Sequence, residues 1–96
     1  MAKQAIGILE TKGLVALVQG TDAMLKSANV ELTGLMKGVG SALVSVVITG
    51  DVAAVNAAIE TGAETAGRYG EVVSAHTIAR PHDDVETIVP ALKATA

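Results

Sequence analysis

The chain has 96 residues, a formal net charge of −3, a mean hydropathy of +0.48, no Cys and one aromatic side chain, Tyr69. Its seven Lys and Arg residues are scattered singly, which argues against nucleic acid as a partner because duplex binding needs a basic face and single-strand binding needs stacking rings. The absence of Cys excludes disulfides, thiolate nucleophiles and sulfur-rich metal sites.

The apolar runs are also informative about location. They are only a few residues long, far below the roughly 18 to 20 that a membrane-spanning helix needs, so we expect no transmembrane segment and no membrane partner. Residues 1–8 carry polar side chains and glycine where a secretory signal needs an apolar block, so we expect a cytosolic protein.

The length predicts one domain over residues 1–96, with a core at 4–90 and a flexible tail at 91–96. A chain this short buries only about 60 to 65% of its unfolded surface. Because 50% of the residues are apolar, we expect apolar surface beyond what its own core can bury.

The first third of the chain predicts a strand, a helix and a second strand. Residues 4–9 are rich in Ile and Leu, and the polar residues at 10–12 with Gly13 predict a turn. Residues 13–27 show the helical period, and 30–35 alternate as a half-buried strand does. The apolar residues on one side of the predicted helix are Leu14, Leu17, Val18, Met24, Leu25 and Ala28.

The middle of the chain continues with a hairpin. Two glycines within residues 36–41 permit positive φ and so a tight connection to a strand at 42–48. An Ala-rich helix is predicted at 51–66, with the Asp51 carboxylate accepting free N–H groups of its first turn.

The last part predicts a β-branched strand at 72–78 and a short helix at 83–88. Asp83 and Glu86 have capping-box spacing, and Pro90 prevents further growth. The complete order is β-α-β-β-α-β with a short C-terminal helix. This order predicts an α+β, ferredoxin-like fold with both helices on one face of an antiparallel sheet.

Gly38 and Gly40 could form an anion-binding turn, because successive backbone N–H groups can surround a phosphate. Their spacing matches neither common phosphate-binding glycine motif, and the segment joins strand to strand where both motifs require a following helix. We therefore favour a plain hairpin over a nucleotide site.

His76 and His82 are the only side chains suited to acid–base work near neutral pH or to nitrogen ligation of a metal. A third ligand would have to come from Asp83, Asp84 or Glu86, and we expect neither a metal nor another cofactor. No serine has a neighbouring base that would activate it, so we expect no enzyme; the serines considered are Ser27, Ser41, Ser45 and Ser74.

Arg80 precedes Pro81, which holds it extended and directs its guanidinium. It belongs to the last of four separate blocks that occur in a familiar order. The blocks are Ile6-Gly7-Ile8-Leu9-Glu10-Thr11-Lys12-Gly13-Leu14, Asp22-Ala23-Met24-Leu25-Lys26-Ser27-Ala28-Asn29-Val30, Gly50-Asp51-Val52 and Ala79-Arg80-Pro81-His82. Together they resemble the single-domain shell proteins of bacterial microcompartments, over about residues 4–90.

The resemblance implies a flat cyclic hexamer whose copies tile edge to edge into facets of a shell around encapsulated enzymes, inside the cytoplasm. A closed ring of this kind needs two different complementary patches per subunit. The resemblance places Lys26, Asn29, Arg80 and His82 at the edge between hexamers. There, Lys and Arg donors can bond main-chain carbonyls across a two-fold axis.

The resemblance also places Lys37, Gly38, Val39, Gly40, Ser41 and Ala42 around a central pore that passes small polar or anionic metabolites. The family commonly has Lys-Ile-Gly-Ser-Gly there, whereas this segment is one residue longer and ends in Ala42. Thr49 stands where the family usually has Arg before Gly-Asp-Val.

The leading hypothesis is therefore a structural shell protein whose partners are itself, other shell proteins and encapsulated enzymes. The alternative is a ferredoxin-like sensing module that binds a small ligand between subunits near Gly38 and Gly40. A small ferredoxin-like phosphatase ranks last, because no loop carries a recognisable Arg and Asn oxyanion site.

Overall fold

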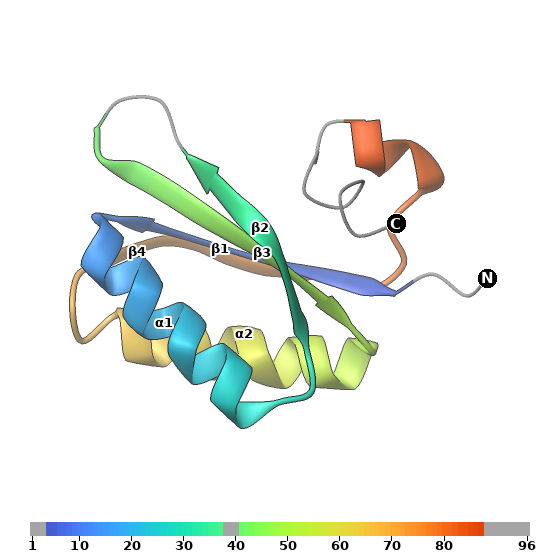
Figure 1. Cartoon of the computed structure of the whole chain (residues 1–96), viewed down its shortest axis with the longest axis horizontal. Helices are drawn as coiled ribbons and strands as arrows, with labels where there is room; N and C mark the ends of the chain where they lie inside the picture. Colours follow the sequence, from blue (N-terminus) through green and yellow to red (C-terminus); the bar gives the residue numbers. More distant parts are fainter. Residues whose placement is uncertain (1–3, 38–40, 88–96) are drawn as a thin grey trace.

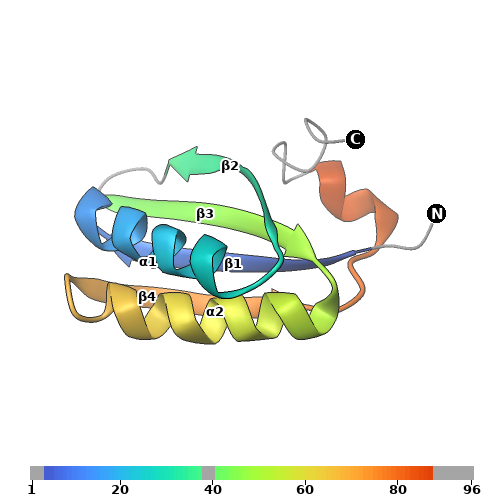
Figure 2. The same cartoon turned by 60° about the horizontal axis from the view of Figure 1, so that its bottom comes forward.

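The computed structural model describes residues 4–37 and 41–87, with 34–37, 86 and 87 as backbone only. These residues form one antiparallel sheet with both helices on the same face, in the strand order β2-β3-β1-β4 (Figures 1 and 2). The predicted α+β, ferredoxin-like fold is confirmed. The elements are β1 (Ala5–Lys12), α1 (Leu14–Ser27), β2 (Glu31–Lys37), β3 (Leu43–Gly50), α2 (Val52–Ala66), β4 (Glu71–Ile78) and the 3-10 helix η1 (Asp83–Thr87).

Strand β1 lies in the middle of the sheet and pairs with both β3 and β4. Its alternate residues point to opposite faces, so Leu9 and Thr11 are fully buried on the helix side while Ile6 is buried on the other side. The helix-side core also includes Val46 and Ile48 of β3 and the inner sides of both helices.

The two helices pack closely where each has a glycine, Gly20 in α1 and Gly62 in α2. A Cβ added at Gly20 would lie 2.9 Å from the Gly62 carbonyl oxygen, closer than real Cβ atoms approach. The absence of a side chain at Gly20 is therefore required for this helix-to-helix distance. Within the described chain, neither helix is both long and apolar enough to span a bilayer.

The sheet face opposite the helices carries a second, smaller apolar cluster. Ile6 and Val47 are buried there, and Ile8 and Val85 pack against them. Since Val85 belongs to η1, this contact holds the short C-terminal helix against the sheet. The prediction of a short closing helix is confirmed as a 3-10 helix ending at Thr87; Ile88, Pro90 and the predicted tail at 91–96 lie outside the described residues.

The predicted turn at residues 10–12 is wrong, because β1 continues to Lys12. Thr11 is 0% exposed and pairs with Val44 and Val72 on either side. Its hydroxyl donates to the Gly13 carbonyl at 3.0 Å, which satisfies the polar group inside the core. Neighbouring strands thus extend a segment that its polar side chains alone predicted to be a turn.

The predicted carboxylate cap at Asp51 is also wrong. Asp51 occupies the N-cap position of α2 with extended backbone, but its side chain makes no capping hydrogen bond. Its carbonyl accepts the Val55 N–H at 2.9 Å, the ordinary first bond of the helix, and its side chain is exposed.

Each edge strand contains an irregularity that sequence periodicity did not predict. The pairing of β2 with β3 shifts register between Leu32 and Gly34, and the Thr33 hydroxyl between them donates to the Val47 carbonyl at 2.9 Å. The pairing of β4 with β1 shifts in the same way opposite Glu10 and Thr11. Both shifts add an extra residue to an edge strand, as a β-bulge does.

Candidate functional site

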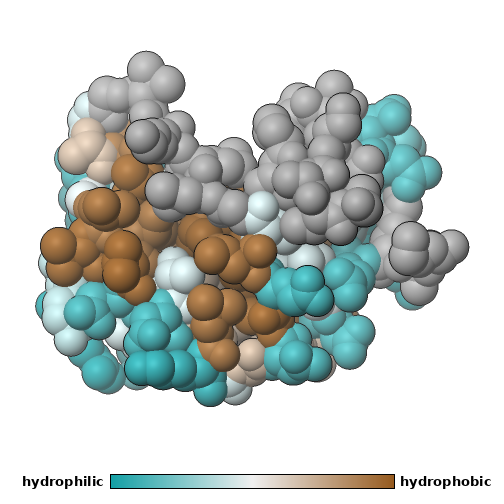
Figure 3. Space-filling model, in the orientation of Figure 1, coloured by the Kyte–Doolittle hydropathy of each residue, from teal (hydrophilic) through white to brown (hydrophobic). Residues whose placement is uncertain are grey.

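An apolar groove lies between α1 and β2 on the face seen in Figure 3, where hydrophobic side chains gather above a hydrophilic border. Its volume is about 330 Å³. Leu14, Val18 and Leu25 of α1 are 54, 56 and 43% exposed, and Leu32 of β2 is 45% exposed. The complete lining is Leu14, Leu17, Val18, Thr21, Asp22, Leu25, Leu32 and Val46. A groove lined by exposed apolar side chains is a candidate interaction surface.

The groove exists because α1 carries apolar residues on more than its inner side. The apolar residues predicted to share one side of this helix do not all face the core. Leu17 and Met24 are buried with Ala16 and Gly20, but Leu14, Val18 and Leu25 lie on the outer side. The wide apolar stripe is therefore divided between the core and the surface, as the excess of apolar residues predicted.

The predicted pore segment, residues 37–42, joins β2 to β3. Lys37 is the last residue of β2 and pairs with Val44, while Gly38, Val39 and Gly40 lie outside the described residues. Ser41 and Ala42 are exposed.

Ser41 and Ala42 both have left-handed backbone, with φ of 53° and 60°. The glycine-based prediction of positive φ in this loop missed these two residues. The Ala42 carbonyl accepts the Gly13 N–H at 2.8 Å, which ties the loop to the turn between β1 and α1. Left-handed backbone is unfavourable for a residue with a side chain, so this anchored geometry is imposed by the surrounding structure.

The predicted edge residues fall into two pairs at the same end of the sheet. Lys26 and Asn29 lie at the end of α1 and just after it, and both are exposed. The Asn29 carbonyl lies against Gly50, at the end of β3, and Gly50 pairs with Ala5. Arg80 and His82 are exposed and follow β4. The last residue of β4, Ile78, pairs with Ile6, the neighbour of Ala5 in β1.

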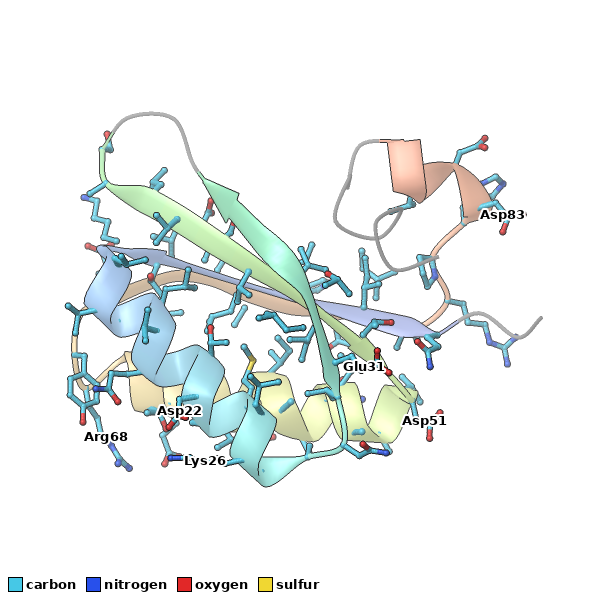
Figure 4. The ribbon with its side chains drawn as sticks, in the orientation of Figure 1. Asp22, Lys26, Glu31, Asp51, Arg68 and Asp83 are labelled. Carbon is cyan, nitrogen blue, oxygen red and sulfur yellow. The ribbon has the colours of Figure 1, made fainter. Side chains whose placement is uncertain are left out.

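Lys26 and His82 each contact an acidic residue close to them in sequence. The Lys26 Nζ lies 2.9 Å from Asp22 Oδ2, one helical turn away in α1 (Figure 4). The His82 Nδ1 accepts the Asp84 N–H at 3.0 Å and lies 3.8 Å from Asp84 Oδ2. The structure therefore places the two pairs at one end of the sheet, with Lys26 and His82 each held by a neighbour in sequence.

Asp22 is the residue that the sequence reasoning missed. It lines the groove and also pairs with Lys26, so it lies where the apolar surface meets the predicted edge. Its spacing of four residues before Lys26 is the arrangement in which oppositely charged side chains meet on a helix, and this signal was present in the sequence.

The candidate side chains for catalysis or metal binding are dispersed. His76 is exposed on β4, paired with Ile8, while His82 lies beyond the strand end. Among the side chains that the structure describes, which do not include that of Glu86, no three His, Asp or Glu are grouped so that they could hold a metal ion. The Ser27 hydroxyl donates to the Met24 carbonyl at 3.3 Å, a contact within the end of α1.

Thr49, the predicted departure from the family pattern, is buried in β3. Its hydroxyl donates to the Ala5 carbonyl at 3.0 Å, with the Gln4 Oε1 at 3.2 Å. These contacts connect the start of β1 to the end of β3.

Comparison with known proteins gives one consistent family. The sequence profile of the BMC domain matches residues 5–81. The chain is 53% identical over 90 residues to the bacterial microcompartment shell protein PduA of Citrobacter freundii, covering 94% of this chain and 96% of that protein. It is 46% identical over 88 residues to the carboxysome shell protein CcmK2 of Synechocystis, covering 90% and 84% of the two chains.

A solved structure shows the same fold. It is a microcompartment protein from Desulfitobacterium hafniense, with a TM-score of 0.78 and 32% identity, covering 94% of this chain. This chain spans about half (48%) of the length of that solved chain. These matches confirm the resemblance inferred from the four sequence blocks. Because these curated relatives are named as shell proteins, the expectation of a structural protein instead of an enzyme is also confirmed.

Proposed function

Because the chain belongs to the BMC domain family of bacterial microcompartment shell proteins, we propose that it forms cyclic hexamers that tile into the facets of a microcompartment shell in the cytoplasm. In this proposal the whole chain acts as one shell domain. Its partners are further copies of itself, other shell proteins and the enzymes that the shell encloses.

The observation that carries the proposal is the apolar groove beside α1. Burying a fully exposed Val or Leu side chain contributes about 1.5–3 kcal/mol, and the groove has several such side chains that are about half exposed, so docking gains about half of this for each one. A closed ring uses two different patches of each subunit, so the groove supplies one half of every contact around the ring. The sum over the ring offsets the entropy lost on assembly.

We assign the predicted pore to the segment from Lys37 to Ala42. Ser41 and Ala42 are exposed, and the hydrogen bond from the Gly13 N–H to the Ala42 carbonyl holds the backbone where the chain enters β3. Hydroxyl and backbone N–H groups repeated around the ring axis would favour small polar or anionic metabolites. Because this segment has one extra residue and ends in Ala42, we expect the pore to differ in width from one built with the usual family segment.

We assign the edge between hexamers to Lys26, Asn29, Arg80 and His82. All are exposed and they lie at one end of the sheet, whereas the end of β2 and the start of β3 lie at the other. Lys26 and Arg80 both carry donors that do not require a charged partner, since a carbonyl oxygen accepts from either.

Native mass spectrometry of the purified protein at micromolar concentration tests the ring, and we expect a mass of a hexamer. A stable monomer or trimer would contradict the proposal. Electron microscopy then tests the edge. Lys26→Ala or Arg80→Ala should leave the hexamer mass unchanged and abolish sheets.

Arg68→Ala is the matched control for the edge test, because Arg68 is an exposed cation just after α2 that pairs with Glu64 at 3.1 Å. We expect this variant to form sheets like the unmodified chain. If Lys26→Ala or Arg80→Ala dissolved the ring, the edge assignment would be wrong.

A further inference from the structure

Among the described residues, two of the proposed edge residues, Lys26 and His82, lie near a carboxylate, and the pair of Lys26 with Asp22 is the shorter. The Lys26 Nζ lies 2.9 Å from Asp22 Oδ2, and the two side chains are 76 and 55% exposed (Figure 4). The acidic residue precedes the basic one, which is the favourable orientation on a helix. Exposed ion pairs of this kind contribute little to the free energy of folding, so folding stability does not explain the presence of this pair.

Among the residues that line the groove, Asp22 is the charged one. It lines the groove together with Val18 and Leu25, while Lys26 lies one turn further along the same helix. Its carboxylate therefore lies between the surface assigned to the ring and the side chain assigned to the edge.

A two-fold edge pairs the same patch of two copies, and only residues near the axis meet their own copy. With Lys26 placed near this axis, its two ammonium groups of like charge approach each other. We propose that Asp22 is a positioning residue for this edge: it fixes the direction of the Lys26 side chain and compensates its charge. One Lys26 N–H directed at Asp22 leaves two donors for carbonyls of the neighbouring hexamer. This inference rests on the proposed tiling function.

The test compares Asp22→Asn with Asp22→Glu and with the control Glu64→Gln. The control removes a carboxylate from another pair of residues four apart, at the C-terminal end of α2, where Nη2 of Arg68, just beyond the helix, lies 3.1 Å from Glu64 Oε1. Hexamer mass is measured first. The lowest protein concentration that gives sheets is then measured by pelleting and electron microscopy at about 0.05 M and about 0.5 M NaCl, since the Debye length falls severalfold over this range.

We expect all variants to keep the thermal midpoint, and Glu64→Gln to keep the hexamer mass. Because Asp22 also lines the groove, the sheets of its variants are compared only where native mass spectrometry shows the hexamer. Asp22→Asn should raise the sheet-forming concentration about three- to tenfold at low salt, because the two Lys26 charges then repel without compensation. The difference should shrink at high salt, where exposed charges are screened. Asp22→Glu, which keeps the charge, and Glu64→Gln should behave like the unmodified chain.

Sheets that form as readily, or more readily, with Asp22→Asn at low salt would overturn the inference. A ring that dissolves in Asp22→Asn would also overturn it and assign Asp22 to the groove contact. A lower thermal midpoint with sheets that high salt does not restore would indicate a folding role only. Failure of the proposed function is visible separately, because the unmodified chain would then form no hexamers or no sheets at either salt concentration.

Discussion

The two helices of this protein are nearly equal in length and pack on the same face of the sheet, yet their outer sides differ. Helix α1 exposes Leu14, Val15, Val18 and Leu25, whereas Val52 is the large aliphatic residue that α2 exposes in the described structure. The remaining outer residues of α2 are alanine or polar, and include Asn56, Glu60, Thr61 and Glu64. Both helices thus cover the core, but α2 has a mostly polar outer side, whereas α1 also exposes the apolar surface that we assign to the contact between subunits.

The largest expected effect separates the outer sides of the two helices. Val18→Asp places a carboxylate in the groove, where docking of a neighbouring copy would bury it unpaired, so we expect complete loss of the hexamer. Ala57→Asp, at an exposed position of α2, should keep the hexamer. Native mass spectrometry reads both, with circular dichroism confirming that each chain is folded. Equal loss in both variants would remove the distinction between the helices.

The next effect tests what the helices share. Gly20→Ala would bring a Cβ within 2.9 Å of the Gly62 carbonyl and of Leu9 Cδ2, so the helices must separate. We expect unfolding free energy to fall by about 1–3 kcal/mol, as overpacking of a close-packed core does. Chemical denaturation of the chain measures it.

The control for that measurement is Thr61→Ala, which leaves the helix contact unchanged at an exposed position beside Gly62. A Gly20→Ala variant as stable as the unmodified chain would mean that the inner side of α1 has room that the structure does not show.

The smallest effect concerns the exposed valine of α2. Val52→Thr removes a 43% exposed apolar side chain that does not line the groove, so we expect unfolding free energy to change by no more than about 0.5 kcal/mol and the hexamer to remain. Thermal denaturation and native mass spectrometry check both. Loss of the ring in this variant would extend the assembly surface to the start of α2.

Much of this fold was predictable because local periodicity and tertiary burial agree. The alternating residues of β2 and the helical spacing of α2 gave the correct element types. Errors arose where tertiary contacts decide. Thr11 is polar yet buried between two strands, and Asp51 occupies a cap position without bonding from its side chain.

The site shows the same division. Exposed charged residues such as Lys26 and Arg80 could be singled out from sequence, and the structure places them at one end of the sheet. The split of the α1 stripe between core and surface could not be predicted, because Leu17 and Val18 have equal apolar character and differ only in what packs over them. The left-handed backbone at Ser41 and Ala42 was equally hidden, since neither is glycine.

The packing of Val85 against the cluster of Ile6 and Val47 has a practical consequence for rebuilding the chain. It brings the first strand and the last helix of the described chain side by side, so a short peptide could link them without crossing the sheet. New termini opened between β2 and β3 would then leave the order of strands in space unchanged. Circular permutation would thus move the chain ends to a different rim of the subunit while keeping its interior intact.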